Sequence, residues 1–166
     1  MLDTFTPRGR TFHHIQTVAA EKFCSRYGCY PIESGPADPI DYKMLKDGKA
    51  VGFFEVKNRN MSYDPSYGGF RLPNGYRTRR YLISKHKIDA MLLQAKATEL
   101  PCGLLVQTME DEPMTLLFWS IVDANGNFKF KMEYERTETQ ATCNGGTANR
   151  VNAFLPISKA IIHEYP

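Results

Sequence analysis

Glu55 and Lys57 are separated by one residue, Val56, within a run of apolar and branched side chains. Side chains alternate across a strand, so a carboxylate and an ammonium at this spacing project from the same face while Val56 points to the other. A second carboxylate, Asp41, opens another short apolar run upstream. The sequence therefore offers two carboxylates and a lysine that one site could combine.

Converging carboxylates are suitable ligands for a hard divalent cation such as Mg²⁺, which takes one or two of them and completes its shell with water and substrate phosphate. Asp41 and Glu55 are thus candidate ligands for Mg²⁺ or Mn²⁺, with the backbone carbonyl of Val56 as a further one. The ion would polarise a phosphoryl group and activate a bound water, while Lys57 would stabilise the developing charge. Phosphodiester hydrolysis is the reaction that needs this set.

A predicted hairpin decides whether the two carboxylates meet. Its parts are two strands, 41–45 and 50–57, and the turn Lys46-Asp47-Gly48-Lys49. With a two-residue turn the partner of Asp41 is Phe54, whereas one extra residue, as in a glycine bulge at Gly48, places Asp41 opposite Glu55. The predicted site therefore depends on a bulge.

Helices and further strands flank this hairpin. Apolar residues recur at helical spacing over 11–27, and again after Ser84, a good N-cap, up to residue 100. Other expected elements are an extended piece and turns over 30–39, strands over 103–108 and 115–122, a hairpin at Asn125-Gly126 into 128–134, a polar loop over 137–147, and a strand or helix around 154–163. This order predicts an α/β fold with a mixed central sheet flanked by helices.

The segment 58–81 has many Tyr, Gly, Asn and Pro residues without a sustained period, which indicates a long loop. Basic residues without an acidic neighbour gather over 71–87. We expect an acidic partner, DNA, to bind there through Arg77, Arg79, Arg80, Lys85 and Lys87. The formal net charge of +3 is too small to require such a partner by itself.

Length and composition favour one globular domain. The 166 residues are 42% hydrophobic and 23% charged, as in ordinary proteins with a single core. We expect a cytoplasmic protein without a membrane partner, because no apolar run reaches the roughly 18 to 20 residues of a membrane span and the first residues lack the apolar stretch of a signal peptide. The four cysteines have no CxxC spacing and are expected to be reduced thiols.

The pattern Asp38-Pro39-Ile40-Asp41, followed by Gly52-Phe53-Phe54-Glu55-Val56-Lys57, resembles the signature of the PD-(D/E)XK nucleases, which include restriction enzymes, phage exonucleases and Holliday-junction resolvases. The resemblance implies a restriction-endonuclease-like fold, with 1–166 as one nuclease domain and 58–81 as an inserted substrate loop. It implies metal-dependent hydrolysis of DNA in phage or mobile-element replication, recombination, repair or defence. It assigns metal binding to Asp41 and Glu55 and catalysis to Lys57, and adds Glu21 on the first helix as a further site residue.

Two alternatives stay open. Asp38 rivals Asp41 as the first carboxylate, since no proline directly precedes Asp41; Asp41 is preferred because it opens the strand, whereas the prolines around Asp38 keep that residue in the connection. The rival function is a catalytically silent nuclease-fold protein that binds nucleic acid or a partner protein. The intact Asp41, Glu55 and Lys57 favour the enzyme. Junction resolvases and restriction enzymes of this type tend to be dimers, so the resemblance allows a homodimer.

Overall fold

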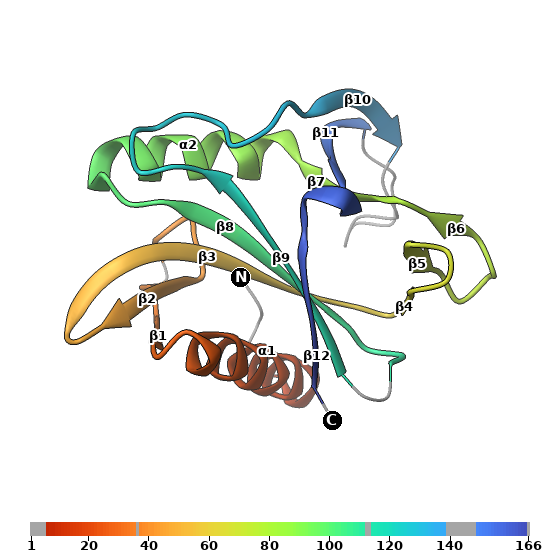
Figure 1. The fold of residues 1–166 in the computed structure, drawn as a ribbon, viewed down its shortest axis with the longest axis horizontal. Helices are drawn as coiled ribbons and strands as arrows, with labels where there is room; N and C mark the ends of the chain where they lie inside the picture. Colours follow the sequence, from red (N-terminus) through yellow and green to blue (C-terminus); the bar gives the residue numbers. More distant parts are fainter. Residues whose placement is uncertain (1–5, 36, 112–113, 139–148, 166) are drawn as a thin grey trace.

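In a computed structural model, which describes residues 6–35, 37–111, 114–138 and 149–165, a mixed six-stranded sheet carries one helix on each face (Figure 1). The strands of this sheet, in spatial order, are β1 (Tyr30–Glu33), β2 (Tyr42–Lys46), β3 (Lys49–Arg59), β8 (Cys102–Thr108), β9 (Met114–Val122) and β12 (Ile161–Tyr165). Neighbouring strands are antiparallel except β3 and β8, which are parallel. The predicted α/β class and mixed central sheet are confirmed.

Both helices begin at a side-chain cap. The hydroxyl of Thr6 accepts from the Gly9 amide at 3.0 Å at the start of α1 (Pro7–Arg26), and Ser84 accepts from the Lys87 amide at 3.3 Å at the start of α2 (Lys85–Thr98). The N-cap predicted at Ser84 is thus confirmed. Neither helix of the described ranges is both long and apolar enough to cross a membrane.

Because side chains alternate across β3, some of them pack on the α1 side of the sheet and the others on the α2 side. Phe54 and Val56 pack in a cluster with Phe23 of α1, whereas Phe53 belongs to the cluster that α2 enters. Glu55 and Lys57 follow Phe53 at two-residue steps, so they share the α2 face of the sheet. The second cluster also contains Trp119, which is fully buried.

The long loop predicted over 58–81 is wrong. The segment holds a small antiparallel sheet of β4 (Ser62–Asp64), β5 (Gly69–Arg71) and β6 (Arg77–Thr78), which extends beyond the end of β3 (Figure 1). Phe70 is buried there and packs edge to face on Tyr81 at 6.1 Å between ring centroids. Strands of two or three residues are too short to show an alternating pattern in sequence.

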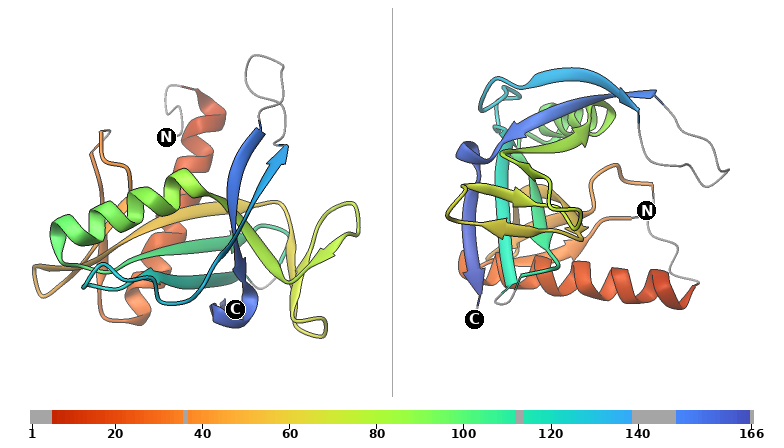
Figure 2. Two further views of the ribbon diagram at one scale, coloured as in Figure 1. Left: turned by 90° about the horizontal axis from the view of Figure 1, so that it is seen from above. Right: turned by 90° about the vertical axis from the view of Figure 1, so that its right-hand side faces the viewer.

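A third sheet lies beside the N-terminal end of α2 (Figure 2). Its strands, in spatial order, are β10 (Glu133–Glu138), β11 (Asn149–Pro156) and β7 (Arg80–Ser84). The tight turn predicted at Asn125-Gly126 is confirmed, but the strand predicted over 128–134 is wrong. Among the described residues only an isolated bridge joins Val122 to Phe128, and β10 pairs with β11 instead. The first two residues of the loop predicted over 137–147 belong to β10 instead. The rest of that prediction falls within 139–148, which lie outside the described residues.

The expected strand or helix around 154–163 consists of the end of β11, a short 3-10 turn over Ile157–Lys159, and the start of β12. The three described cysteines, Cys24, Cys29 and Cys102, are free thiols, as expected. Cys143 lies outside the described residues.

Candidate active site

The β2–β3 hairpin contains a bulge, although not where the sequence predicts it. Its turn has two residues, Asp47 and Gly48, with φ of 51° and 77°, which match a type I′ turn. The register changes further along, at the step from Met44 to Leu45, where Val51 is an extra residue on β3. A bulge at Val51 thus replaces the glycine bulge predicted at Gly48.

This bulge aligns the two carboxylates. Beyond it Tyr42 pairs with Phe54, so Asp41 lies at the level of Glu55. The Asp41 side chain also reaches β3, where its Oδ2 accepts from the Val56 amide at 3.2 Å. The rival residue, Asp38, is exposed and accepts from the Gly35 amide at 2.8 Å within its own turn. The geometry therefore favours Asp41 over Asp38 as the first carboxylate.

Glu55 is only 1% exposed. Its pKa is raised to about 7, first by burial and then by a hydrogen bond with Asp41 and repulsion from the Asp41 charge. Lys87 and Lys57 act in the opposite direction and lower the pKa of Glu55. The centre thus consists of two adjacent carboxylates, and the two lysines beside them stabilise the charged form of Glu55.

Lys87 belongs to this centre. Its Nζ lies 2.9 Å from Oε2 of Glu55 and donates to the Pro39 carbonyl at 2.6 Å. The sequence predicts Lys87 as a phosphate-binding residue on the basic surface, but the structure places its ammonium against the buried carboxylate. A basic run in sequence cannot show which of its members turns toward the sheet.

On the face of the sheet that α1 covers, the side chain that contacts the backbone of the site is Gln16 and not Glu21. Gln16 Nε2 donates to the Val56 carbonyl, the predicted backbone ligand, at 3.3 Å. Glu21 is exposed, and its charge acts on Tyr42; no contact described here joins it to Asp41 or Glu55. Sequence reasoning missed Gln16, although it precedes the buried Ala20 and Phe23 at helical spacing and so lies on the face that packs on the sheet.

The residues present fit a small divalent cation. Asp41 and Glu55 give two carboxylates at one level of the sheet, and two adjacent negative charges of this kind are stabilised by added positive charge. No cluster of three or more His, Cys, Asp or Glu side chains occurs in the described part of the chain, so a closed metal site is not built from these residues there. A bound ion would supply Lewis-acid polarisation of a phosphate and an activated water.

The other predicted DNA-binding residues differ in how they are paired. Arg77 and Arg79 are exposed and lie over the Tyr67 ring, at 5.5 and 4.2 Å from its centroid. Arg80 lies 3.3 Å from Glu133, and Lys85 lies 2.8 Å from Asp89. Exposed pairs of this kind are weak and can exchange for phosphate. No described interaction joins these cations to Asp41 or Glu55.

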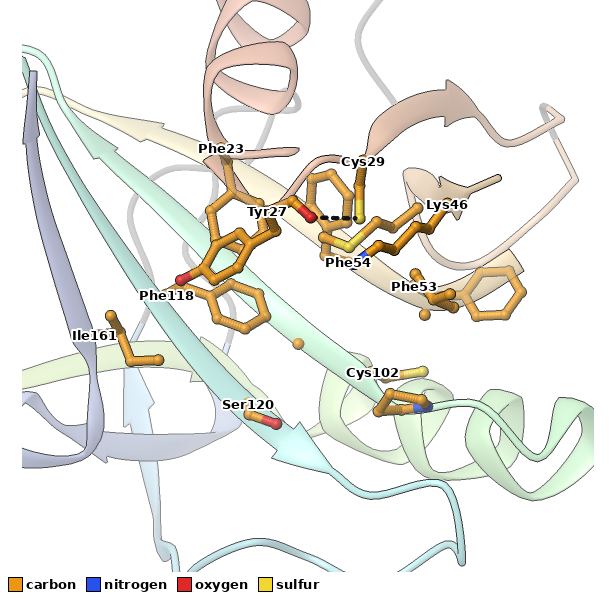
Figure 3. Close-up of a pocket in the computed structure, with 15 residues that line it drawn as sticks. Phe23, Tyr27, Cys29, Lys46, Phe53, Phe54, Cys102, Phe118, Ser120 and Ile161 are labelled. Carbon is orange, nitrogen blue, oxygen red and sulfur yellow. Dashed lines mark hydrogen bonds between the residues drawn. The ribbon is translucent and has the colours of Figure 1, made fainter. Parts of the chain in front are cut away.

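Figure 3 shows the residues that line an apolar cavity, whose volume is about 400 Å³. Its walls include the rings of Phe23, Phe54 and Phe118, so it opens on the face of the sheet that α1 covers. Because Glu55 projects from the opposite face of β3, this cavity is separate from the carboxylate centre.

Comparisons of the chain with models of known protein families, with curated proteins and with solved structures find no match.

We expect the affinity for Mn²⁺ to depend on pH. The pKa of Glu55 is about 7, and a metal must compete with the proton, so affinity should rise between about pH 6 and 8 and level off above that. Below the pKa the change should approach about tenfold per pH unit. Calorimetry with Mn²⁺ measures it, and Glu55→Gln should lose most of the affinity and its pH dependence. Equal binding by the wild type and the Glu55→Gln variant would show that the site lies elsewhere.

Proposed function

We propose that this chain is a Mg²⁺- or Mn²⁺-dependent deoxyribonuclease of the PD-(D/E)XK type. The observation that carries the proposal is the bulged hairpin, which sets Asp41 and Glu55 at one level while Lys57 follows Glu55 on the same face of β3. Two carboxylates and a lysine in this arrangement are the groups that phosphodiester hydrolysis requires.

Each residue has a role in that reaction. Asp41 and Glu55 hold the cation, and the Val56 carbonyl, oriented by Gln16, is a further ligand. Lys57 is partly exposed, so its ammonium can meet a phosphate from the solvent side and stabilise negative charge as it develops. Burial of Glu55 keeps its carboxylate fixed before substrate arrives.

The order of elements supports a restriction-endonuclease-like core. In that family a helix precedes the hairpin, and a helix and a strand follow it. Here α1 precedes β2 and β3, and α2 leads into β8, which pairs with β3 in parallel. The β4–β5–β6 sheet and the β10–β11 pair are additions to such a core.

We expect the arginines of this inserted region to bind phosphate. Replacing Arg77, Arg79 and Arg80 together by Ala should weaken binding to all DNA sequences alike and flatten the dependence of log affinity on log salt by up to about one unit per lost contact. A gel-shift salt titration measures both quantities. The matched control replaces Lys129 and Lys131, exposed cations between β9 and β10, and should leave the slope unchanged. An unchanged slope in the arginine variant would show that these arginines do not bind DNA phosphates.

The catalytically silent alternative has one observation in its favour: the Lys87 ammonium already neutralises Glu55. Incubation with labelled linear, circular, single-stranded and branched DNA in Mg²⁺, Mn²⁺ or EDTA separates the two functions. An enzyme should give metal-dependent products, and the substrates that are cut define endo or exo action. A silent protein should retain DNA in gel shifts and leave every substrate intact.

A further inference from the structure

Lys87 is held by two groups that belong to the carboxylate centre. Its ammonium lies 2.9 Å from Glu55 Oε2 and 2.6 Å from the Pro39 carbonyl oxygen. Its side chain is 26% exposed, whereas that of Glu55 is 1% exposed. The ammonium therefore approaches the buried carboxylate from the side that remains open to solvent.

The position of Lys87 in α2 is not explained by helix stability. The first turn of α2 holds Lys85, His86 and Lys87 and no acidic residue. Cations are disfavoured at this end of a helix because its free amide groups give it positive charge. Lys85 is neutralised within the helix by Asp89 at 2.8 Å, but the partner of Lys87 is on β3. The Lys87 charge is thus balanced by Glu55 on β3 and not by a residue of its own helix.

Charge balance at the centre bears on metal binding. With both carboxylates ionised, Asp41 and Glu55 carry two negative charges, and Lys57 and Lys87 carry two positive charges. A divalent cation added to this set leaves excess positive charge, and it competes with the Lys87 ammonium for Glu55 Oε2. Lys87 contacts Glu55 Oε2 directly and its side chain is 26% exposed, so Lys87 is the cation that a metal would displace.

We propose that Lys87 is a built-in counter-ion of the carboxylate centre, which a divalent cation displaces from Glu55 and which then faces the substrate phosphate. This inference rests on the proposed nuclease function. In the metal-free protein the ammonium keeps Glu55 and the Pro39 loop in place; in the metal-bound protein it is released toward solvent, where a phosphodiester can accept its hydrogen bonds. Lys87 thus limits metal affinity in the free protein and contacts the substrate phosphate in the metal-bound protein.

The test compares Mn²⁺ binding by the wild type, Lys87→Met and Lys85→Met, measured by calorimetry at pH 8. Methionine keeps most of the chain length and removes the charge, so Lys87→Met should bind Mn²⁺ about tenfold more tightly or better. Lys85→Met, two residues away and paired with Asp89, is the matched control and should bind like the wild type. Lys87→Gln, which removes the charge but keeps a donor for Pro39, should also bind more tightly and covers the case in which methionine disturbs folding.

A second measurement follows Lys87 itself. In a nitrogen-15 NMR spectrum selective for lysine ammonium groups, the metal-free protein should give a slowly exchanging Lys87 signal, assigned by its absence from Lys87→Gln. Saturating Mg²⁺ should abolish or shift this signal, while the Lys85 signal stays. A Lys87 signal that Mg²⁺ leaves unchanged would overturn the inference.

The outcomes separate this inference from the proposed function. Equal Mn²⁺ affinity in the wild type and both Lys87 variants would overturn the displacement and leave the nuclease proposal standing. Binding by the Lys87 variants alone would support the counter-ion role and favour the catalytically silent alternative for the wild type. Absence of Mn²⁺ binding in all of them would overturn the metal site and the inference with it.

Discussion

Replacing Asp41 by Asn or Lys57 by Ala is expected to lower DNA cleavage by at least about 10²-fold while DNA affinity changes little. Asp41 lies beside Glu55 and its side chain is held by the Val56 amide, so the Asn variant keeps the shape and loses the charge. In the proposed mechanism Lys57 stabilises charge that develops only in the transition state. Cleavage assays beside gel shifts measure the two effects separately.

The matched control is Asp38→Asn. Asp38 is the nearest rival carboxylate in sequence, but it is exposed and engaged with the Gly35 amide, so its replacement should leave cleavage close to the wild-type rate. If Asp41→Asn still cuts like the wild type, the catalytic assignment fails, and Asp38 becomes the next residue to test.

Glu55→Gln should stabilise the metal-free protein at pH 8 while it abolishes cleavage. Folding raises the pKa of Glu55 from 4.5 to about 7, so the folded state binds this proton more tightly than the unfolded state. The contribution of Glu55 to stability therefore falls as pH rises from about 4.5 to 7 and stays low above that. A shift of this size corresponds to up to about 3 kcal/mol.

Urea unfolding in EDTA at pH 5 and pH 8 measures this effect. The advantage of the Glu55→Gln variant should be small at pH 5 and large at pH 8, whereas Mg²⁺ should stabilise only the wild type. Glu21→Gln is the control, because Glu21 is exposed on α1 and its replacement should change neither quantity. A Glu55→Gln variant that is less stable than the wild type at pH 8 would contradict the burial argument.

The parts of the site that the sequence predicts are those set by local periodicity. Alternation in a strand suffices to put Glu55 and Lys57 on one face, and the Asp47-Gly48 pair suffices to predict a tight turn. The bulge at Val51 is different, because a shift of register depends on how β3 packs between β2 and β8. Sequence reasoning could state only that a bulge was needed.

Contacts between distant segments account for the other differences. The strands β10 and β11 pair although residues 139–148 separate them in sequence. Neither segment alone indicates this pairing, whereas Asn125-Gly126 indicates a hairpin with the strand before it. Lys87 belongs to a basic run, and its contact with Glu55 appears only once α2 is packed on the sheet. One signal was available: Lys87 directly precedes the buried Ile88, at the edge of the helix face that packs inward.

The proposed role of Asp41 and Glu55, to hold a metal for phosphodiester cleavage, is tested most directly by cleavage of labelled DNA by the wild type, Glu55→Gln and Asp41→Asn in Mg²⁺, Mn²⁺ and EDTA. We expect products with the wild type in Mg²⁺ or Mn²⁺, none in EDTA, and at least about 10²-fold less with either variant. Products that persist in EDTA, or equal cleavage by the wild type and both variants, would contradict this role.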